Sequence, residues 1–183
     1  MSPRLGEDVR HRVRLWATWD IPAFPKILGS LGVSGLFALD TGQPYGAAGE
    51  ILIGDYVTNP GYVTPPYTVS YWFTGRDAYR TPTVTHLDLA LGWSLRLSGF
   101  EIFVQPQVIN VFNNDALATS DPNLVDVGVS TAAYAPGLRP FDPFHEKPVE
   151  GVHWAKSPTF GQALTPDAYQ QPRTFRISLG VRF

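Results

Sequence analysis

The feature that most constrains the fold is a strict alternation of apolar and polar residues over unusually long stretches. Such alternation predicts β-strands with one apolar and one polar face. The alternating stretches are residues 9–21, 31–41, 85–97, 100–111 and 173–183. Each has roughly 9–13 residues, whereas globular strands most often have about 5–6 and a strand tilted across a bilayer needs about 9–11. The lengths therefore favour an all-β, antiparallel transmembrane barrel.

The composition agrees with an all-β chain and argues against other classes of protein. The 17 glycines and 17 prolines argue against a helical fold. The 14 basic and 16 acidic residues leave a net charge of −2, which gives no basic surface for nucleic acid. The sequence has no cysteine, so disulfides and thiolate metal sites are excluded. We expect no nucleic-acid partner, no cofactor and no metal.

The connections between the predicted strands alternate in length. The first two strands are joined by PAFPKILGS, and the third and fourth by Ser98-Gly99, a two-residue hairpin signal. The other two connections are very long, about residues 42–83 and 112–171. Short periplasmic turns and long extracellular loops are typical of outer-membrane barrels. We therefore expect the two long loops on the cell surface.

The Ser98-Gly99 turn and a run of arginines assign the two faces. A two-residue turn places Leu97 and Phe100 on the same face. Since one arginine at the bilayer midplane costs roughly 2–4 kcal/mol, the arginine-bearing face should point into the lumen or against protein. The inward charges expected are Arg10, Arg12, Arg14, Arg96, Arg176, Arg182, Asp20, Asp88 and Glu101. Six cations minus three anions give this face a net charge of +3. These charges could pair with neighbouring strands or with a plug, or they could attract an anionic solute.

Proline and aromatic residues add two expectations. Pro106 cannot donate a ladder hydrogen bond, so it should form a bulge, and the faces of Ile109 and Asn110 beyond it are left open. An aromatic girdle near the periplasmic interface is expected from Trp19, Phe100 and Phe183.

Five strands do not close a membrane barrel, whose smallest single-chain form has eight. The N-terminal MSPRLGEDVRHRVRL also lacks the apolar segment of a signal peptide. We therefore expect residues 1–183 to form the C-terminal part of a larger barrel.

Several segments resemble one known family. HRVRLWATWDIP and the following TGQPY resemble late barrel strands of TonB-dependent outer-membrane receptors. LDLALGWSLRLSGFEIFVQPQVINVFNN resembles their penultimate hairpin, with an N-x-F-N ending at Asn110, Phe112 and Asn113. FDPFHEKPVEGVHWAKSPTFGQAL and YQQPRTFRISLGVRF resemble the last loop and strand of the Oar-like branch, whose members carry a carboxypeptidase-regulatory-like domain.

The resemblance implies a fold, a location and partners. It implies a barrel of about 22 strands around a plug, in the outer membrane of a Gram-negative bacterium. The plug side carries a TonB box that couples ligand uptake to the proton gradient. The implied partners are outer-membrane lipid, the assembly machinery, the rest of the receptor and, through its N-terminal part, TonB. No enzyme activity is implied. The C-terminal alternation resembles the signal read during assembly, at Phe175, Ile177, Leu179, Val181 and Phe183.

The long loops contain further candidate residues. Aromatic side chains that could contact a ligand or pack the loops together are Tyr45, Tyr67, Tyr71 and Trp72. The second loop, at about −4, could hold calcium, but it lacks the spacing of an EF-hand. A metal site could be considered at Asp142, His145, Glu146, Glu150 and His153, but their spacing matches no known set of metal ligands.

Two other functions remain open at this point. An outer-membrane adhesion or surface-structure barrel would share the strands without transport. A soluble β-sandwich binding domain would share the alternation. The missing nucleophile elbow argues against a hydrolase.

Overall fold

The computed structural model describes residues 8–55, 66–143 and 145–183, and within these ranges the chain is all-β without an α-helix. The chain divides into two compact units. The sheet unit comprises Val9–Gly42, Pro82–Ala118 and Tyr169–Phe183. The loop unit comprises Met1–Asp8, Gln43–Thr81 and Thr119–Ala168. Among the described residues, no helix is long and apolar enough to cross a membrane.

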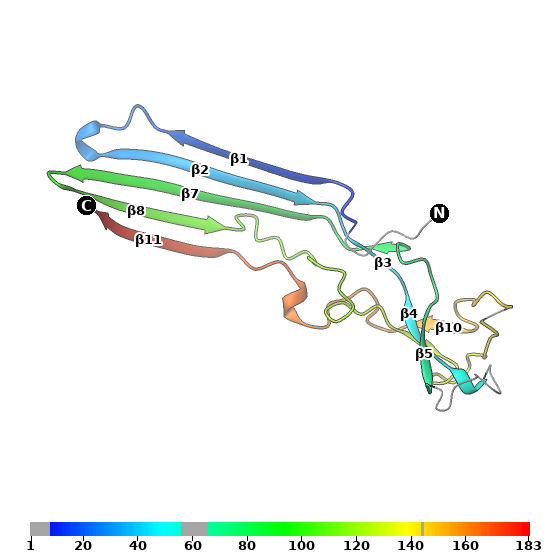
Figure 1. Cartoon of the computed structure of the whole chain (residues 1–183). Helices are drawn as coiled ribbons and strands as arrows, with labels where there is room; N and C mark the ends of the chain where they lie inside the picture. Colours follow the sequence, from blue (N-terminus) through cyan, green and yellow to red (C-terminus); the bar gives the residue numbers. More distant parts are fainter. Residues whose placement is uncertain (1–7, 56–65, 144) are drawn as a thin grey trace. The chain divides into compact units, whose positions relative to one another are not determined.

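The sheet unit is one antiparallel sheet of five strands in the order β1-β2-β7-β8-β11 (Figure 1). The strands are β1 (Arg12–Asp20), β2 (Ser30–Asp40), β7 (Val84–Leu97), β8 (Phe100–Ile109) and β11 (Thr174–Arg182). All five predicted strands are confirmed, with ends that differ by up to three residues. The fourth strand ends at Ile109 because Asn110 leaves extended backbone, with a φ of 53°.

Both short connections lie at the same end of the sheet as the C-terminus (Figure 1). At Ser98-Gly99, Leu97 pairs with Phe100 and Gly99 has a φ of 104°, a conformation that glycine adopts without steric cost. The other short connection contains the 3₁₀ turn η1 (Lys26–Leu28). The two-residue hairpin predicted from the sequence is therefore confirmed.

The register places most of the apolar residues of the five strands on one face. Across β1, β2 and β7, Leu15 pairs with Phe37 and Phe37 with Leu87. Between β7 and β8, the pairs include Trp93 with Val104 and Leu95 with Ile102. A one-residue slip in any pair would send a whole strand's apolar set to the other face, so the shared pattern fixes the register.

The predicted bulge at Pro106 is wrong. On either side of it, Leu89 pairs with Val108 and Trp93 with Val104, so the register does not shift. Pro106 itself pairs with Ile177 of β11. The missing N–H interrupts only the pairing with β7 and leaves the strand in register. Ile109 therefore lies on the polar face.

The sheet is open, because β1 and β11 are each paired with a single neighbour. The described residues contain no closed barrel. The sheet unit also has little core of its own. Of the buried hydrophobic side chains in the described ranges, only Leu117 belongs to it.

The loop unit contains a hydrophobic core that periodicity did not predict. Three two-stranded ribbons pair β3 (Pro44–Tyr45) with β6 (Tyr79–Arg80), β4 (Ala48–Leu52) with β5 (Thr68–Trp72), and β9 (Val129–Thr131) with β10 (Trp154–Lys156). Two 3₁₀ turns are η2 (Ile53–Asp55) and η3 (Pro166–Ala168). The buried cluster consists of Ala47, Ile51, Phe73, Phe141 and Trp154. The two long connections, which were expected as loops, thus form a packed unit.

Candidate functional site

The most prominent candidate surface is the apolar face of the sheet. On β11, Phe175, Ile177, Leu179 and Val181 pair with Val108, Pro106, Val104 and Ile102 of β8. From Phe175 to Phe183, the exposed fractions of these apolar residues run from 51% for Val181 to 100% for Phe183. Exposed apolar side chains also lie on β1, at Leu15 and Trp19. Contiguous apolar surface of this kind marks a contact with lipid or protein.

The opposite face carries ion pairs between neighbouring strands. Arg12 and Arg14 of β1 both donate to the carboxylate of Asp40 on β2, at 3.1 and 2.6 Å. Arg182 of β11 lies 3.4 Å from Glu101 of β8. Asp40 was missing from the predicted inward set, and its inclusion changes the sum from +3 to +2. Pairing within the sheet therefore accounts for part of the inward charge.

The polar face also contains a hollow of about 400 Å³ lined by residues from all five strands. Trp16 of β1 pairs with Leu36 of β2 there, and the Trp16 side chain is 77% exposed. Gln107 and Arg176 line the same hollow. The alternation pattern did not identify Trp16 as a candidate residue, because Trp16 is an apolar residue on the otherwise polar face of β1.

A buried asparagine fixes the end of β8 to its neighbours. The Asn110 backbone N–H donates to Asp88 Oδ1 at 2.9 Å. Its side-chain amide donates to the carbonyls of Asn114, at 2.9 Å, and Gln171, at 2.7 Å, and its Oδ1 accepts from the Asn114 N–H. All of these groups are satisfied by polar partners, as buried polar groups require. Asn110 therefore joins β7, β8 and the segment that leads into β11.

The neighbouring asparagines complete this corner of the sheet. Asn113 has a φ of 50°, and its Oδ1 accepts from the Arg173 N–H at 2.9 Å. Asn114 Nδ2 donates to Thr85 Oγ1 at 2.7 Å. Asparagine tolerates the left-handed region better than most residues. The N-x-F-N ending thus has a structural role in this chain.

A histidine and an aspartate on β7 continue the same network. His86 Nε2 lies 2.6 Å from Asp88 Oδ1. Gln170 Nε2 lies 3.1 Å from the Thr85 carbonyl and 2.9 Å from His86 Nδ1. Since the carbonyl can only accept, the Gln170 amide donates to both, and the His86 proton lies on Nε2. The His86–Asp88 pair is therefore held in place by hydrogen bonds from Gln170 and from the Asn110 backbone.

The four candidate aromatic residues fall into two groups. Tyr45 packs against Tyr79 and Phe160, with ring centroids 5.5 and 5.8 Å apart. Tyr71 contacts the rings of Phe73 and Phe141 at 5.0 and 5.4 Å. By contrast, the side chains of Tyr67 and Trp72 are exposed. Contact with a ligand stays a prediction; Tyr67 is accessible for it, whereas the Trp72 ring is partly covered by the Arg76 guanidinium, 4.9 Å from its centroid.

Asp126 organises one part of the loop unit. Its Oδ1 accepts from the Gly128 N–H at 2.8 Å, and its Oδ2 accepts from Thr159 Oγ1 at 2.7 Å and from Ser157 Oγ. Desolvation raises the pKa of this carboxyl, but the hydrogen bonds from Ser157, Thr159 and Gly128 outweigh it, so the pKa lies below its ordinary value. The carboxylate therefore acts as a structural acceptor that links two segments.

The acidic and histidine residues of the second long loop do not converge. His145 Nδ1 lies 2.6 Å from Asp142 Oδ2, His153 Nδ1 accepts from the Val149 N–H, and Glu150 pairs with Lys156. Within residues 8–55, 66–143 and 145–183 no group of three or more potential ligands could hold a metal ion.

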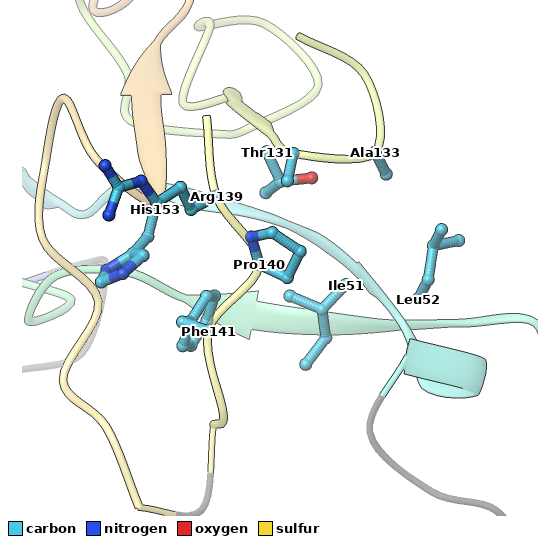
Figure 2. A pocket seen from close by; sticks show the side chains of 9 residues that line it. Ile51, Leu52, Thr131, Ala133, Arg139, Pro140, Phe141 and His153 are labelled. Atoms are coloured by element: carbon cyan, nitrogen blue, oxygen red, sulfur yellow. The ribbon is translucent and has the colours of Figure 1, made fainter. Parts of the chain in front are cut away.

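A small cavity beside the core is lined by Ile51, Thr131, Phe141 and His153, among others (Figure 2). Its volume is about 10 Å³, enough for about one water molecule. It is too small for an organic ligand.

Comparison with known proteins found no match: no family model, no curated protein and no solved structure is significantly similar to this chain.

Proposed function

We propose that the chain is part of the barrel wall of a TonB-dependent receptor that takes up a ligand across the outer membrane of a Gram-negative bacterium. The observation that carries the proposal is the uncovered apolar face of the five-stranded sheet. Its strands have 9 to 14 residues, and a strand tilted across the bilayer needs about 9–11. The sequence resemblance supplies the family.

The opposite face supports this orientation. The ion pairs of Arg12 and Arg14 with Asp40, and of Arg182 with Glu101, lie on the face away from the apolar set. A bilayer on the apolar side leaves these charges in the lumen. Transmembrane barrel strands alternate apolar outward and polar inward in this way. In the reverse orientation, paired arginines would face hydrocarbon.

The open edges require further strands. In lipid, unpaired backbone groups along β1 and β11 would each cost several kcal/mol. In the proposed receptor the edges pair with the remaining strands of a closed barrel. Ligand capture belongs to the extracellular loop unit and the plug. TonB-driven movement of the plug, which lies outside this chain, then opens the path, and no covalent chemistry is involved.

The terminal strand gives a direct test of outer-membrane assembly. Deletion of Phe183 from the full-length gene product should lower its level in the outer-membrane fraction, because the exposed aromatic end is the expected assembly signal. Ser178→Ala, on the polar face of the same strand, is the matched control and should leave that level unchanged. An unchanged level after the deletion would refute the assembly role.

Binding to TonB distinguishes a receptor from an adhesion barrel that does not transport. The purified full-length protein should bind the periplasmic domain of TonB in a direct titration if it is a receptor. Correct insertion in the outer membrane without TonB binding would support the adhesion function.

A further inference from the structure

The turn between β1 and β2, residues 21–29, presents apolar side chains that packing within the chain does not explain. Ile27 is 86% exposed, and Leu28 is also exposed. The turn lies at the end of the sheet that carries Ser98-Gly99 and the C-terminus (Figure 1). Turns are ordinarily polar, so two adjacent exposed apolar side chains next to the apolar sheet face point to a partner.

The turn is held against the apolar side of the sheet. Trp93, whose side chain belongs to the apolar face of β7, donates its indole N–H to the Leu28 carbonyl at 2.8 Å. Gly29 has a φ of 99°, and a Cβ there would overlap the Ser94 carbonyl oxygen. These two contacts bring the turn close to β7 and continue the apolar face to the end of the sheet.

The backbone of the turn satisfies many of its own polar groups. Four N–H groups donate within the turn or to β2, those of Ile21, Phe24, Leu28 and Gly29, and Pro22 and Pro25 have no N–H. Such closure matters near hydrocarbon, where water is not available to solvate free donors. Of the seven N–H groups in residues 21–29, four are therefore hydrogen-bonded, and those of Ala23, Lys26 and Ile27 are left without a partner among the described residues.

One cation accompanies these apolar side chains. Lys26 is exposed and lies directly before Ile27 in η1. A lysine can place its stem along apolar surface and its ammonium at the level of lipid headgroups. Exposed Trp19 of the adjacent strand adds the kind of aromatic side chain that favours the membrane interface.

We propose that the β1–β2 turn is an anchor in the periplasmic leaflet, with Ile27 and Leu28 inserted among acyl chains and Lys26 bound to the phosphate of an anionic phospholipid. The inference rests on the proposed outer-membrane function and deepens it. Continuity with the apolar sheet face and the single cation beside the inserted side chains select lipid as the occupant.

Spin labels in the full-length protein test the anchor. Single labels replace Leu15 (apolar face of β1), Ile27 (turn) and Ser98 (the other short turn) by way of cysteine, which this chain otherwise lacks. In vesicles of phosphatidylcholine with phosphatidylglycerol, the labels at 15 and 27 should be more accessible to oxygen than to a water-soluble nickel chelate. The label at 98 should show the opposite order. Ile27 is exposed, so its replacement should not disturb the fold.

The outcomes separate the anchor from the barrel. A water-exposed label at 27 with a lipid-exposed label at 15 would overturn the anchor alone. Water exposure at both sites would overturn the membrane orientation as well. Lys26→Glu should move the label at 27 toward water in the anionic vesicles, whereas Lys147→Glu in the loop unit should not. An unchanged label after Lys26→Glu would refute the phosphate contact.

Discussion

The backbone N–H of Asn110, at the end of β8, donates to the carboxylate of Asp88 on β7 at 2.9 Å. Its fully buried side chain bonds at the same time to the segment that precedes β11, through the Gln171 carbonyl. One residue thus holds three adjacent strands at the end of the sheet where the long connections leave.

Asn110→Ala should be strongly destabilising. The left-handed backbone costs an L-residue other than asparagine, aspartate or glycine roughly 1–2 kcal/mol. Loss of the side chain leaves buried partners unsatisfied, at about 1–3 kcal/mol. We expect a loss of about 2–5 kcal/mol in the free energy of unfolding of the full-length protein, measured by urea titration. Asn110→Gly relieves the backbone cost and should lose less, and equal effects would contradict the role of the backbone.

Gly180 of β11 should resist replacement by alanine. A Cβ at this position would overlap the Phe103 ring on the paired strand β8. Overpacking of this kind typically costs about 1–3 kcal/mol. Gly180→Ala should therefore lower the urea midpoint of unfolding, and adding Phe103→Ala should restore part of the loss. A double variant no better than Gly180→Ala would contradict the clash.

Much of the sheet could be predicted because its signals are local. Alternation located all five strands, and Ser98-Gly99 located the tight hairpin. Pro106 was misjudged because sequence does not show which neighbour a missing N–H faces. The loop-unit core was missed because Ala47, Phe73, Phe141 and Trp154 come from segments far apart in the chain. No period of two or 3.6 residues links them.

The candidate aromatic residues show the same limit. From the sequence alone, ligand contact and loop packing were both open for Tyr45, Tyr67, Tyr71 and Trp72. Only three-dimensional packing separates the ring contacts of Tyr45 and Tyr71 from the exposed side chains of Tyr67 and Trp72. Likewise, the sequence pattern did not assign Asn110 to either face of the sheet, because its role depends on partners up to 61 residues away.

The two groups of aromatic residues should respond differently to truncation. Tyr71→Ala removes ring contacts with Phe73 and Phe141 and should destabilise the loop unit by about 2–4 kcal/mol. Tyr67→Ala should leave its stability within about 0.5–1 kcal/mol, because this side chain is 79% exposed. Limited proteolysis of the loop unit measures the difference. Similar cleavage rates for the two variants would contradict the packing assignment.

Acid should loosen the part of the loop unit around Asp126. Its pKa is lowered in the folded state, so its contribution to stability is present above the ordinary value of 3.8 and is lost as pH falls through the lower folded value. Amide hydrogen exchange of residues 126–128 and 157–162 should accelerate, after correction for intrinsic rates, below about pH 4. Asp126→Asn removes the titrating group, and an unchanged pH response in this variant would assign it to another residue.

Contact between the apolar sheet face and lipid can be measured on β11. Nitroxide labels at positions 177, 178 and 179 of the full-length protein in vesicles are compared for their accessibility to oxygen and to a water-soluble nickel chelate. We expect alternation: lipid exposure at Ile177 and Leu179, and low oxygen accessibility at Ser178. Equal water accessibility at all three positions, or the reverse alternation, would contradict it.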